Sequence, residues 1–298
     1  MTAKEAKLPK FLNQAKTRFV IPIYQRNYDW TTGQVDKLLK DIDAVGKLEG
    51  TDATHFVGSI VFLHDGIHHT EAITEYEIID GQQRLTTVSL IYARLLEIAR
   101  TQDEPEAEAE LREHYLVNRF AKGSKEKLTL PTNNAPTYKQ ILEGTLAATA
   151  PSEYSRLREN FTHLRQRIQP VDAARVRRGL ERLIFVEISL ERGKDDPQRI
   201  FESLNSTGLA LSQADLIRNH VLIGFGREAQ ERLFVQYWEP IERVTRDTRS
   251  HQPRLSDFVR DYLTMRTRRI TRQSGVYLAF KRYLDEQKEK GATVETVL

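Results

Sequence analysis

The residues best suited to chemistry form the segment Asp80-Gly81-Gln82-Gln83-Arg84, which joins an apolar run to a helical pattern. The run Tyr76–Asp80 predicts a buried strand, and the glycine after it permits a tight turn. Apolar residues at helical spacing from Leu85 to Ile98 predict a helix directly after the turn. Because a helix start presents unpaired N–H groups and a partial positive charge, the segment is typical of an anion site.

The side chains of this turn fit a phosphate ligand. Arg84 carries a permanently charged fork, while Gln82 and Gln83 supply neutral donors and acceptors. Asp80 suits a divalent metal ion or the orientation of an attacking water. The alternative is that Asp80 only caps the helix. Neither GxxxxGK[ST] nor GxGxxG occurs in the chain, so it lacks these two common phosphate-binding loops.

A second group of polar and aromatic residues lies in IPIYQRNYDW, residues 21–30. Burying so many polar and aromatic groups is costly unless they converge on something that satisfies them. Aromatic rings stack on bases, and Gln and Arg read base edges or hold phosphate. The alternative is an ordinary aromatic core beside a surface arginine. The residues concerned are Pro22, Tyr24, Gln25, Arg26, Tyr28 and Trp30.

A third group follows in residues 199–224, RIFESLNSTGLALSQADLIRNHVLIG. Asn205 begins a turn, and Ser212 with Asp215 forms a capping box for a new helix. Arg218 and Asn219 lie beside the apolar stripe of that helix, where buried polar groups need partners. One interpretation is that they line a cleft and contact a ligand. The other is that Arg218 braces Asp215 or a nearby loop.

Composition excludes several classes of protein. The 298 residues contain no cysteine, which excludes disulfides, thiolate nucleophiles and cysteine-bound metals. No stretch approaches the roughly 20 apolar residues that span a bilayer, and the start lacks an apolar signal core, so we expect a cytoplasmic protein without a membrane partner. The net charge is only +3, yet residues 243–272 contain nine Arg, no Lys and three Asp. Such a segment indicates a phosphate-facing surface or a solvated helical face.

Hydrophobic patterns predict an α+β fold. Strands are expected near residues 18–24, 56–63, 76–80 and 183–190, and helices dominate after about residue 150. We therefore expect a small-sheet nucleotide-binding domain over residues 1–100 and a mostly helical domain over residues 101–298. The histidines at His55, His64, His68 and His69 match no standard zinc spacing and suggest an exposed loop instead.

Four motifs, IPIYQRNYDW, HFVGSIVF, YEIIDGQQRLTTVSLI and FESLNSTGLALSQADLIRNHVL, occur here in the order and spacing of one known family. Over about residues 10–225 the chain resembles the amino-terminal domain of GmrSD-type restriction proteins, which include the phosphorothioate-sensing SspE proteins. That domain is similar to the ParB and sulfiredoxin nucleotide-binding fold. The resemblance implies a ParB-like sheet domain in which the DGQQR motif hydrolyses a nucleoside triphosphate, GTP or another, with Mg²⁺.

The resemblance also implies roles for individual residues. Asp80, Gln82, Gln83 and Arg84 would be catalytic, with Asp80 as the metal ligand. The nucleotide would contact Gly81, Gln83, Arg84, Thr86, Thr87, Gln25, Arg26, Gly58 and Ser59. Sensing of DNA modification, or closure of the cleft, would involve Pro22, Tyr24, Gln25, Arg26, Tyr28, Trp30, Asn205, Asp215, Arg218 and Asn219.

One departure from the family concerns the nuclease. Full-length relatives carry a carboxy-terminal HNH-type nuclease, but after His251 this sequence has no metal-ready stretch of that kind. We therefore expect DNA cleavage to require an HNH nuclease domain or subunit outside these residues. The expected function is a nucleotide-hydrolysing, modified-DNA-sensing domain of a phage-defence restriction system, with a homodimer as a further expected assembly. The alternative is a ParB-like clamp that binds nucleotide or DNA without hydrolysis.

Overall fold

The structure, a computed structural model, divides into two compact units. It describes residues 1–48, 50, 52–65, 73–121, 123, 125–131, 133–146, 155–205, 211–248 and 252–298, without the side chains of residues 201 and 203–205. Unit 1 comprises Met1–Pro22 and Asn27–Asp195, and unit 2 comprises Ile23–Arg26 and Asp196–Leu298. The chain therefore leaves unit 1 for four residues, returns, and leaves again after Asp195.

Unit 1 is built on a mixed six-stranded sheet of order β1-β6-β3-β4-β2-β5. Its strands are β1 (Thr2–Lys7), β2 (Thr17–Val20), β3 (His55–His64), β4 (Thr74–Asp80), β5 (Leu128–Thr129) and β6 (Leu183–Glu191). Strand β2 runs parallel to β4 and β5, and β3 runs parallel to β6. The β3–β4 and β1–β6 pairs are antiparallel. Parallel neighbours place the carboxyl ends of β2 and β4 at one edge of the sheet.

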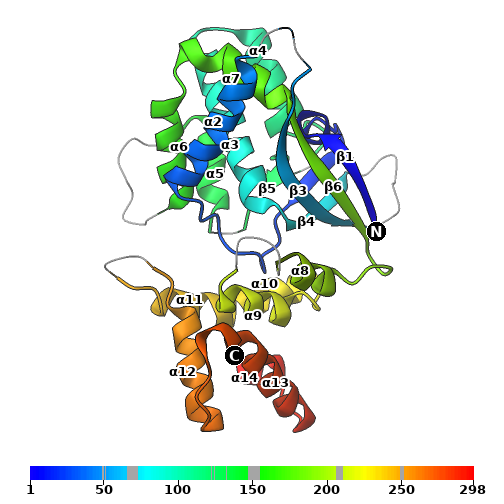
Figure 1. Cartoon of the computed structure of the whole chain (residues 1–298), viewed down its shortest axis with the longest axis vertical. Coiled ribbons are helices and arrows are strands. Elements are labelled where there is room, and N and C mark those ends of the chain that lie inside the picture. The colour runs from blue at the N-terminus through cyan, green and yellow to red at the C-terminus, as the bar shows by residue number, and fades with distance from the viewer. Residues whose placement is uncertain are drawn as a thin grey trace. The chain divides into compact units, whose positions relative to one another are not determined.

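Helices cover one face of this sheet (Figure 1). They are α1 (Leu8–Leu12), α2 (Thr32–Gly46), α3 (Gln82–Thr101), α4 (Pro105–Leu111), α5 (Ala135–Glu143), α6 (Arg156–Arg167) and α7 (Ala173–Glu181), with a π-turn η1 (Arg112–Leu116) and a 3₁₀ turn η2 (Pro170–Asp172). Alternate strand residues point to the helices, as the two-residue period of a strand requires. Phe19, Phe62 and Phe185 pack there around Phe11 of α1, with ring centroids 4.8, 5.5 and 5.0 Å away.

Helices α2 and α7 touch backbone to backbone because each has a glycine at the contact. A Cβ on Gly46 would lie 2.3 Å from the carbonyl oxygen of Arg175, and one on Gly179 would lie 2.1 Å from that of Ile42. Both distances are far below any van der Waals contact, so side chains larger than hydrogen cannot occupy these positions without separating the helices.

Unit 2 is entirely helical in its described residues. Its elements are α8 (Pro197–Asn205), α9 (Gln213–Leu222), α10 (Arg227–Leu233), η3 (Phe234–Trp238), α11 (Glu239–Val244), α12 (Leu255–Thr267), η4 (Gln273–Gly275), α13 (Val276–Glu289) and α14 (Val294–Val297). Ser212 caps α9 as the sequence predicts: its hydroxyl accepts from the N–H of Asp215 at 3.1 Å, and the Asp215 carboxylate accepts from Ser212 N–H at 3.2 Å.

The α+β prediction is confirmed by the mixed sheet and its surrounding helices. Helix α2 begins with a capping box formed by Thr31 and Gln34 and ends at Gly46. The observed division differs from the one expected at residue 100, because β6 pairs with both β1 and β3 and completes the sheet of unit 1. Strand β1 was not predicted, because its segment is polar and shows no alternation of apolar residues. No helix within the described ranges is long and apolar enough to cross a membrane.

The α2–α7 contact predicts a strong stability effect at one glycine. We expect Gly179→Ala to lower the free energy of unfolding of unit 1 by about 3 kcal/mol, because the added methyl group must push two backbones apart. The control is Gly33→Ala in helix α2. A Cβ on Gly33 would lie 3.8 Å from its nearest atom, which is an ordinary van der Waals distance. Alanine there should be neutral or stabilise by up to about 1 kcal/mol. Urea unfolding followed by circular dichroism measures both variants; equal stabilities would contradict the packing argument.

Candidate functional site

Two of the predicted motifs leave the sheet of unit 1 at the same edge. Strand β2 ends at Val20, which pairs in parallel with Glu77 of β4, and β4 ends at Asp80. The segment Ile21–Trp30 and the turn that opens α3 therefore start next to each other. In sheets with parallel strands, ligand sites form where loops leave the carboxyl ends of neighbouring strands.

Gly81 is the N-cap of α3, and its left-handed backbone (φ 91°) favours glycine. A Cβ on Gly81 would also lie 2.9 Å from the carbonyl oxygen of Ser59. Among the described residues no side-chain cap hydrogen bond is found at this helix start, so Asp80 does not act as the cap. The Asp80 carboxylate, whose side chain is 35% exposed, instead lies 3.7 Å from Nη2 of Arg84.

Arg84 is anchored in an irregularity of β3. The pairing of β3 with β6 shifts register between Phe56 and Ser59, which turns strand carbonyls away from the ladder. The guanidinium of Arg84 donates Nη2–H to the carbonyl of Ser59 at 2.8 Å and Nη1–H to that of Val57. Burial lowers the pKa of Arg84, and the nearby Asp80 carboxylate opposes that shift.

Gly58 makes room for this guanidinium. Its φ of +94° lies in the left-handed region, and a Cβ would stand 1.7 Å from Nη1 of Arg84. The glycine of the HFVGSIVF motif and the arginine of the DGQQR motif are thus two halves of one contact. Ser59 contributes its carbonyl to the same contact.

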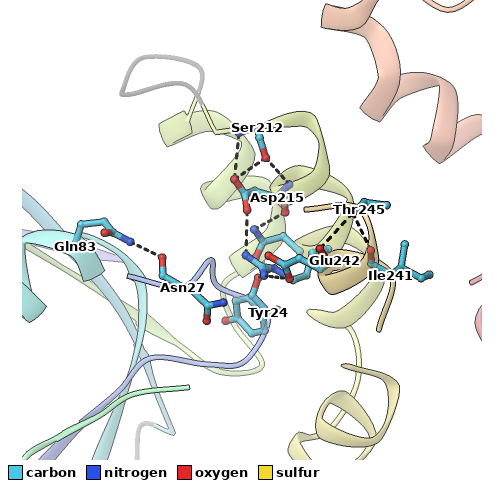
Figure 2. A network of polar contacts seen from close by, with 10 residues as sticks. Tyr24, Asn27, Gln83, Ser212, Asp215, Ile241, Glu242 and Thr245 are labelled. Carbon is cyan, nitrogen blue, oxygen red and sulfur yellow. Dashed lines mark hydrogen bonds and ion pairs between the residues drawn. The ribbon is translucent and has the colours of Figure 1, made fainter. Parts of the chain in front are cut away.

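Gln83 fixes the course of the polar-aromatic segment. Its side-chain oxygen accepts from the N–H groups of Asp29 at 2.9 Å and Trp30 at 3.2 Å, and its Nε2 donates to the carbonyl of Asn27 at 3.1 Å (Figure 2). Residue Gln83 is only 6% exposed, so these hydrogen bonds are shielded from water. They satisfy backbone groups of a segment that has no strand or helix of its own.

The next helical turn forms a buried hydroxyl network. Thr87 donates to the carbonyl of Gln83 at 2.8 Å, and its oxygen lies 2.8 Å from the hydroxyl of Tyr28. Asn160 of α6 donates to that hydroxyl at 3.2 Å and to the carbonyl of Trp30 at 2.6 Å. Burial raises the pKa of Tyr28 to about 12, so its hydroxyl stays protonated. Gln82 and Thr86 are also buried.

The other residues of IPIYQRNYDW are mostly interior. Pro22, Tyr24 and Gln25 are buried, while Arg26 and Trp30 are half-buried. Tyr28 belongs to the core of unit 1, and Trp30 packs against that core. The ring of Tyr28 therefore contributes to the packing of unit 1, while Tyr24 is a buried residue of unit 2.

Unit 2 holds its own part of the segment through Arg218, whose side chain is 2% exposed. The guanidinium donates Nε–H to the carbonyl of Tyr24 at 3.0 Å, Nη2–H to Asp215 at 3.0 Å and Nη1–H to Glu242 at 3.3 Å (Figure 2). The bracing of Asp215 was one of the two interpretations from sequence. Glu242 was not foreseen, because nothing in its own stretch of sequence distinguishes it from a surface glutamate.

Asn219 is the one predicted residue of this group with spare polar capacity. It is 3% exposed, its Nδ2 donates to the carbonyl of Asp215 at 2.9 Å, and its Oδ1 has no partner in the described part of the chain. Asn160 in unit 1 has an unpartnered Oδ1 as well. Asn205 ends α8, and its side chain lies outside the described residues. An unpaired buried acceptor is costly and suits a ligand donor.

The described residues contain no group of three His, Cys, Asp or Glu side chains able to hold a metal ion. Asp80 is a single carboxylate, which fits an ion that arrives coordinated by nucleotide phosphates but not a resident metal.

The order of these motifs is that of a known family. The model of the GmrSD restriction endonuclease N-terminal domain matches residues 8–222. The chain belongs to this family. No match is found among curated proteins. The GmrSD match places the domain in a restriction system, and its span takes in all four motifs, from the polar-aromatic segment to the α9 helix.

The Gly58–Arg84 contact predicts coupled stability effects. We expect Gly58→Ala to expel the guanidinium, so Gly58→Ala and Arg84→Met should each destabilise unit 1 by about 2–4 kcal/mol, and the double variant by less than their sum, with a coupling of about 1–3 kcal/mol. Gly193→Ala is the control, because Gly193 has a similar φ of +84° but open space around its Cβ. Additive effects in urea unfolding would show that the two residues act independently.

The buried arginine of unit 2 predicts a second effect. Arg218→Met should destabilise unit 2 by about 3–5 kcal/mol, because it removes the buried cation that donates to Asp215, Glu242 and the Tyr24 carbonyl. Arg232→Met is matched to it: Arg232 also pairs with a glutamate, Glu295 at 2.9 Å, but its side chain is 47% exposed. That variant should cost less than about 1 kcal/mol. If thermal unfolding showed similar losses of stability for the two variants, the buried ion pairs of Arg218 would stabilise unit 2 no more than an exposed ion pair does.

Proposed function

We propose that this GmrSD domain binds a nucleoside triphosphate at the Asp80–Arg84 turn and hydrolyses it. The observation that carries the proposal is the meeting of two motifs at the carboxyl ends of the parallel strands β2 and β4. There, an uncapped helix start and a partly exposed carboxylate lie side by side. An uncapped helix start binds phosphate through its N–H groups and dipole. A carboxylate beside it can hold a divalent metal ion or orient the attacking water.

The proposed roles differ among the residues of the motif. The first N–H groups of α3, at Gln82 and beyond, would hold phosphate oxygens, and Gln82 and Asp80 would orient the attacking water. Arg84 adds positive charge at the same point while its fork holds β3. Gln83, Thr86 and Thr87 would act as positioning residues, since their side chains lie inside the unit. Electrostatic stabilisation of the phosphates would supply most of the rate effect.

Magnesium is proposed to enter with GTP or another triphosphate, with Asp80 as its protein ligand. Mg²⁺ commonly binds through one carboxylate and substrate phosphates while keeping several waters. When bound, the ion would neutralise charge on the phosphates; the chain's own contribution is to place one carboxylate beside a helix start.

We further propose that the domain senses modified DNA and that nucleotide turnover licenses an HNH nuclease domain or subunit. The polar-aromatic segment supports this proposal, because Gln83 bonds the part of it that belongs to unit 1 and Arg218 bonds the part that belongs to unit 2. Half-buried Arg26 and the unpaired Oδ1 of Asn219 would contact DNA carrying a modification such as phosphorothioate. The setting would be antiviral defence in the cytoplasm, and a homodimer is a compatible assembly.

A second candidate is a ParB-like clamp that binds nucleotide or DNA and changes shape without hydrolysis. The observation that favours it is the use of Gln83 and both Nη groups of Arg84 in internal hydrogen bonds. A motif whose side chains are committed to structure can transmit binding without supplying a chemical group.

Phosphate release from GTP, ATP and CTP with magnesium, with and without modified DNA, tests the proposal. Asp80→Asn should lower turnover by about 100-fold or more while leaving the melting temperature nearly unchanged, because the carboxylate has only one weak partner. Glu75→Gln is the control, a carboxylate on the same strand paired with Arg18 at 3.3 Å. It should leave turnover unchanged. Wild-type binding of nucleotide without turnover would establish the clamp, and full activity of Asp80→Asn would overturn the assigned role of Asp80.

A further inference from the structure

The connection between α12 and η4 in unit 2 is rich in arginine. Residues 266–272 read RTRRITR and contain four arginines and no acidic residue. This connection lies beyond residues 8–222, the part that matches the family model. Arg266 is tied to the fold, since its Nε donates to the hydroxyl of Tyr283 at 3.2 Å and its guanidinium lies 5.8 Å from the ring centroid of Tyr262.

The other three arginines, Arg268, Arg269 and Arg272, are exposed. No carboxylate of the described residues lies within ion-pair distance of them. The acidic residues of the adjacent helix are already engaged: Asp257 pairs with Arg254 at 3.4 Å, and Asp261 pairs with Arg260 at 2.9 Å. Three positive charges therefore face solvent together without compensation.

The backbone adds a second, independent observation. Arg268 ends α12 in the left-handed region, with φ 57° and ψ 26°. Helices that end this way usually place glycine there, because a Cβ costs about 1 kcal/mol in this conformation. The N–H of Arg268 still donates to the carbonyl of Thr264 at 2.8 Å, so the helix ends in an ordinary hydrogen-bonded turn. Strain kept at an exposed position is a sign that the side chain serves another purpose.

One exposed apolar side chain stands among these charges. Ile270 is 92% exposed, between Arg269 and Arg272. Proteins that contact the minor groove combine arginines with an apolar residue that meets the sugars and base steps. All positively charged residues of this connection are arginines and none is a lysine. The arginine side chain can form two parallel hydrogen bonds to a phosphate.

We propose that this connection, Arg268–Arg272, is a contact surface for the phosphate backbone of duplex DNA. The proposal rests on the proposed function only in taking DNA as the partner; it does not require nucleotide hydrolysis. A chain of five residues reaches at most about 17 Å, and each strand of a duplex carries one charge per about 3.4 Å of axis. Three arginines on this connection can thus meet consecutive phosphates, and the contact should be independent of sequence.

The test measures binding of the protein to a fluorescent, unmodified duplex at several salt concentrations, without nucleotide. The triple variant Arg268→Gln, Arg269→Gln, Arg272→Gln should bind at least about tenfold more weakly. Its slope of log affinity against log salt should be shallower by about 3, one for each lost phosphate contact. The control triple variant Lys10→Gln, Lys37→Gln, Lys40→Gln removes the same charge from exposed positions of unit 1 and should leave both quantities nearly unchanged.

Arg268→Gly separates binding from folding. Glycine relieves the left-handed strain, so the melting temperature should rise by about 2 °C while DNA affinity falls. Equal losses in the two triple variants, or an unchanged salt slope in the arginine variant, would overturn the proposal. So would arginine-dependent binding to anionic phospholipid vesicles together with arginine-independent binding to DNA, which would identify a membrane surface instead. Phosphate release without DNA should be the same in all variants, so this result stands apart from the test of hydrolysis.

Discussion

The approach of the Arg84 guanidinium to strand β3 is the contact on which the candidate site depends. Both Nη groups bond carbonyls of a bulged strand, and only a glycine at position 58 leaves space for them. This contact fixes the first turn of α3 against β3. It thereby fixes Asp80 and the start of the helix, while Gly81 allows the same turn to lie against the Ser59 carbonyl. A phosphate site built from backbone N–H groups requires such rigidity, since its donors cannot adjust one by one.

The same logic governs the polar-aromatic segment. Residues 21–30 form no helix or strand, so several of their backbone groups bond to side chains from elsewhere in the chain. Gln83 does this within unit 1 and Arg218 within unit 2. The segment thus contributes residues to both compact units: Ile23–Arg26 belong to unit 2, and the residues before and after them belong to unit 1.

The internal hydrogen bonds of the DGQQR side chains limit which groups of this motif can contact a ligand. Gln83 and Arg84 are the residues of the motif that most resemble phosphate ligands, yet their polar groups bond the protein itself. The chemical capacity of the turn is left with Asp80, Gln82 and the N–H groups of α3. Among the described residues, the arginines of the α12–η4 connection have no carboxylate within ion-pair distance.

Sequence by itself determined the α+β class, the strand-turn-helix around Gly81, the capping box at Ser212, and the family. These features rest on local periodicity, turn chemistry and ordered motifs, which are properties of neighbouring residues. Only the tertiary structure decided that Gly58 serves Arg84, that Gln83 holds residues 27–30, and that Glu242 completes the partners of Arg218. It also assigned β6 to the first unit and brought in the polar strand β1. Such pairings join residues far apart in sequence, and the geometry of a hydrogen bond between them exists only after the chain has folded.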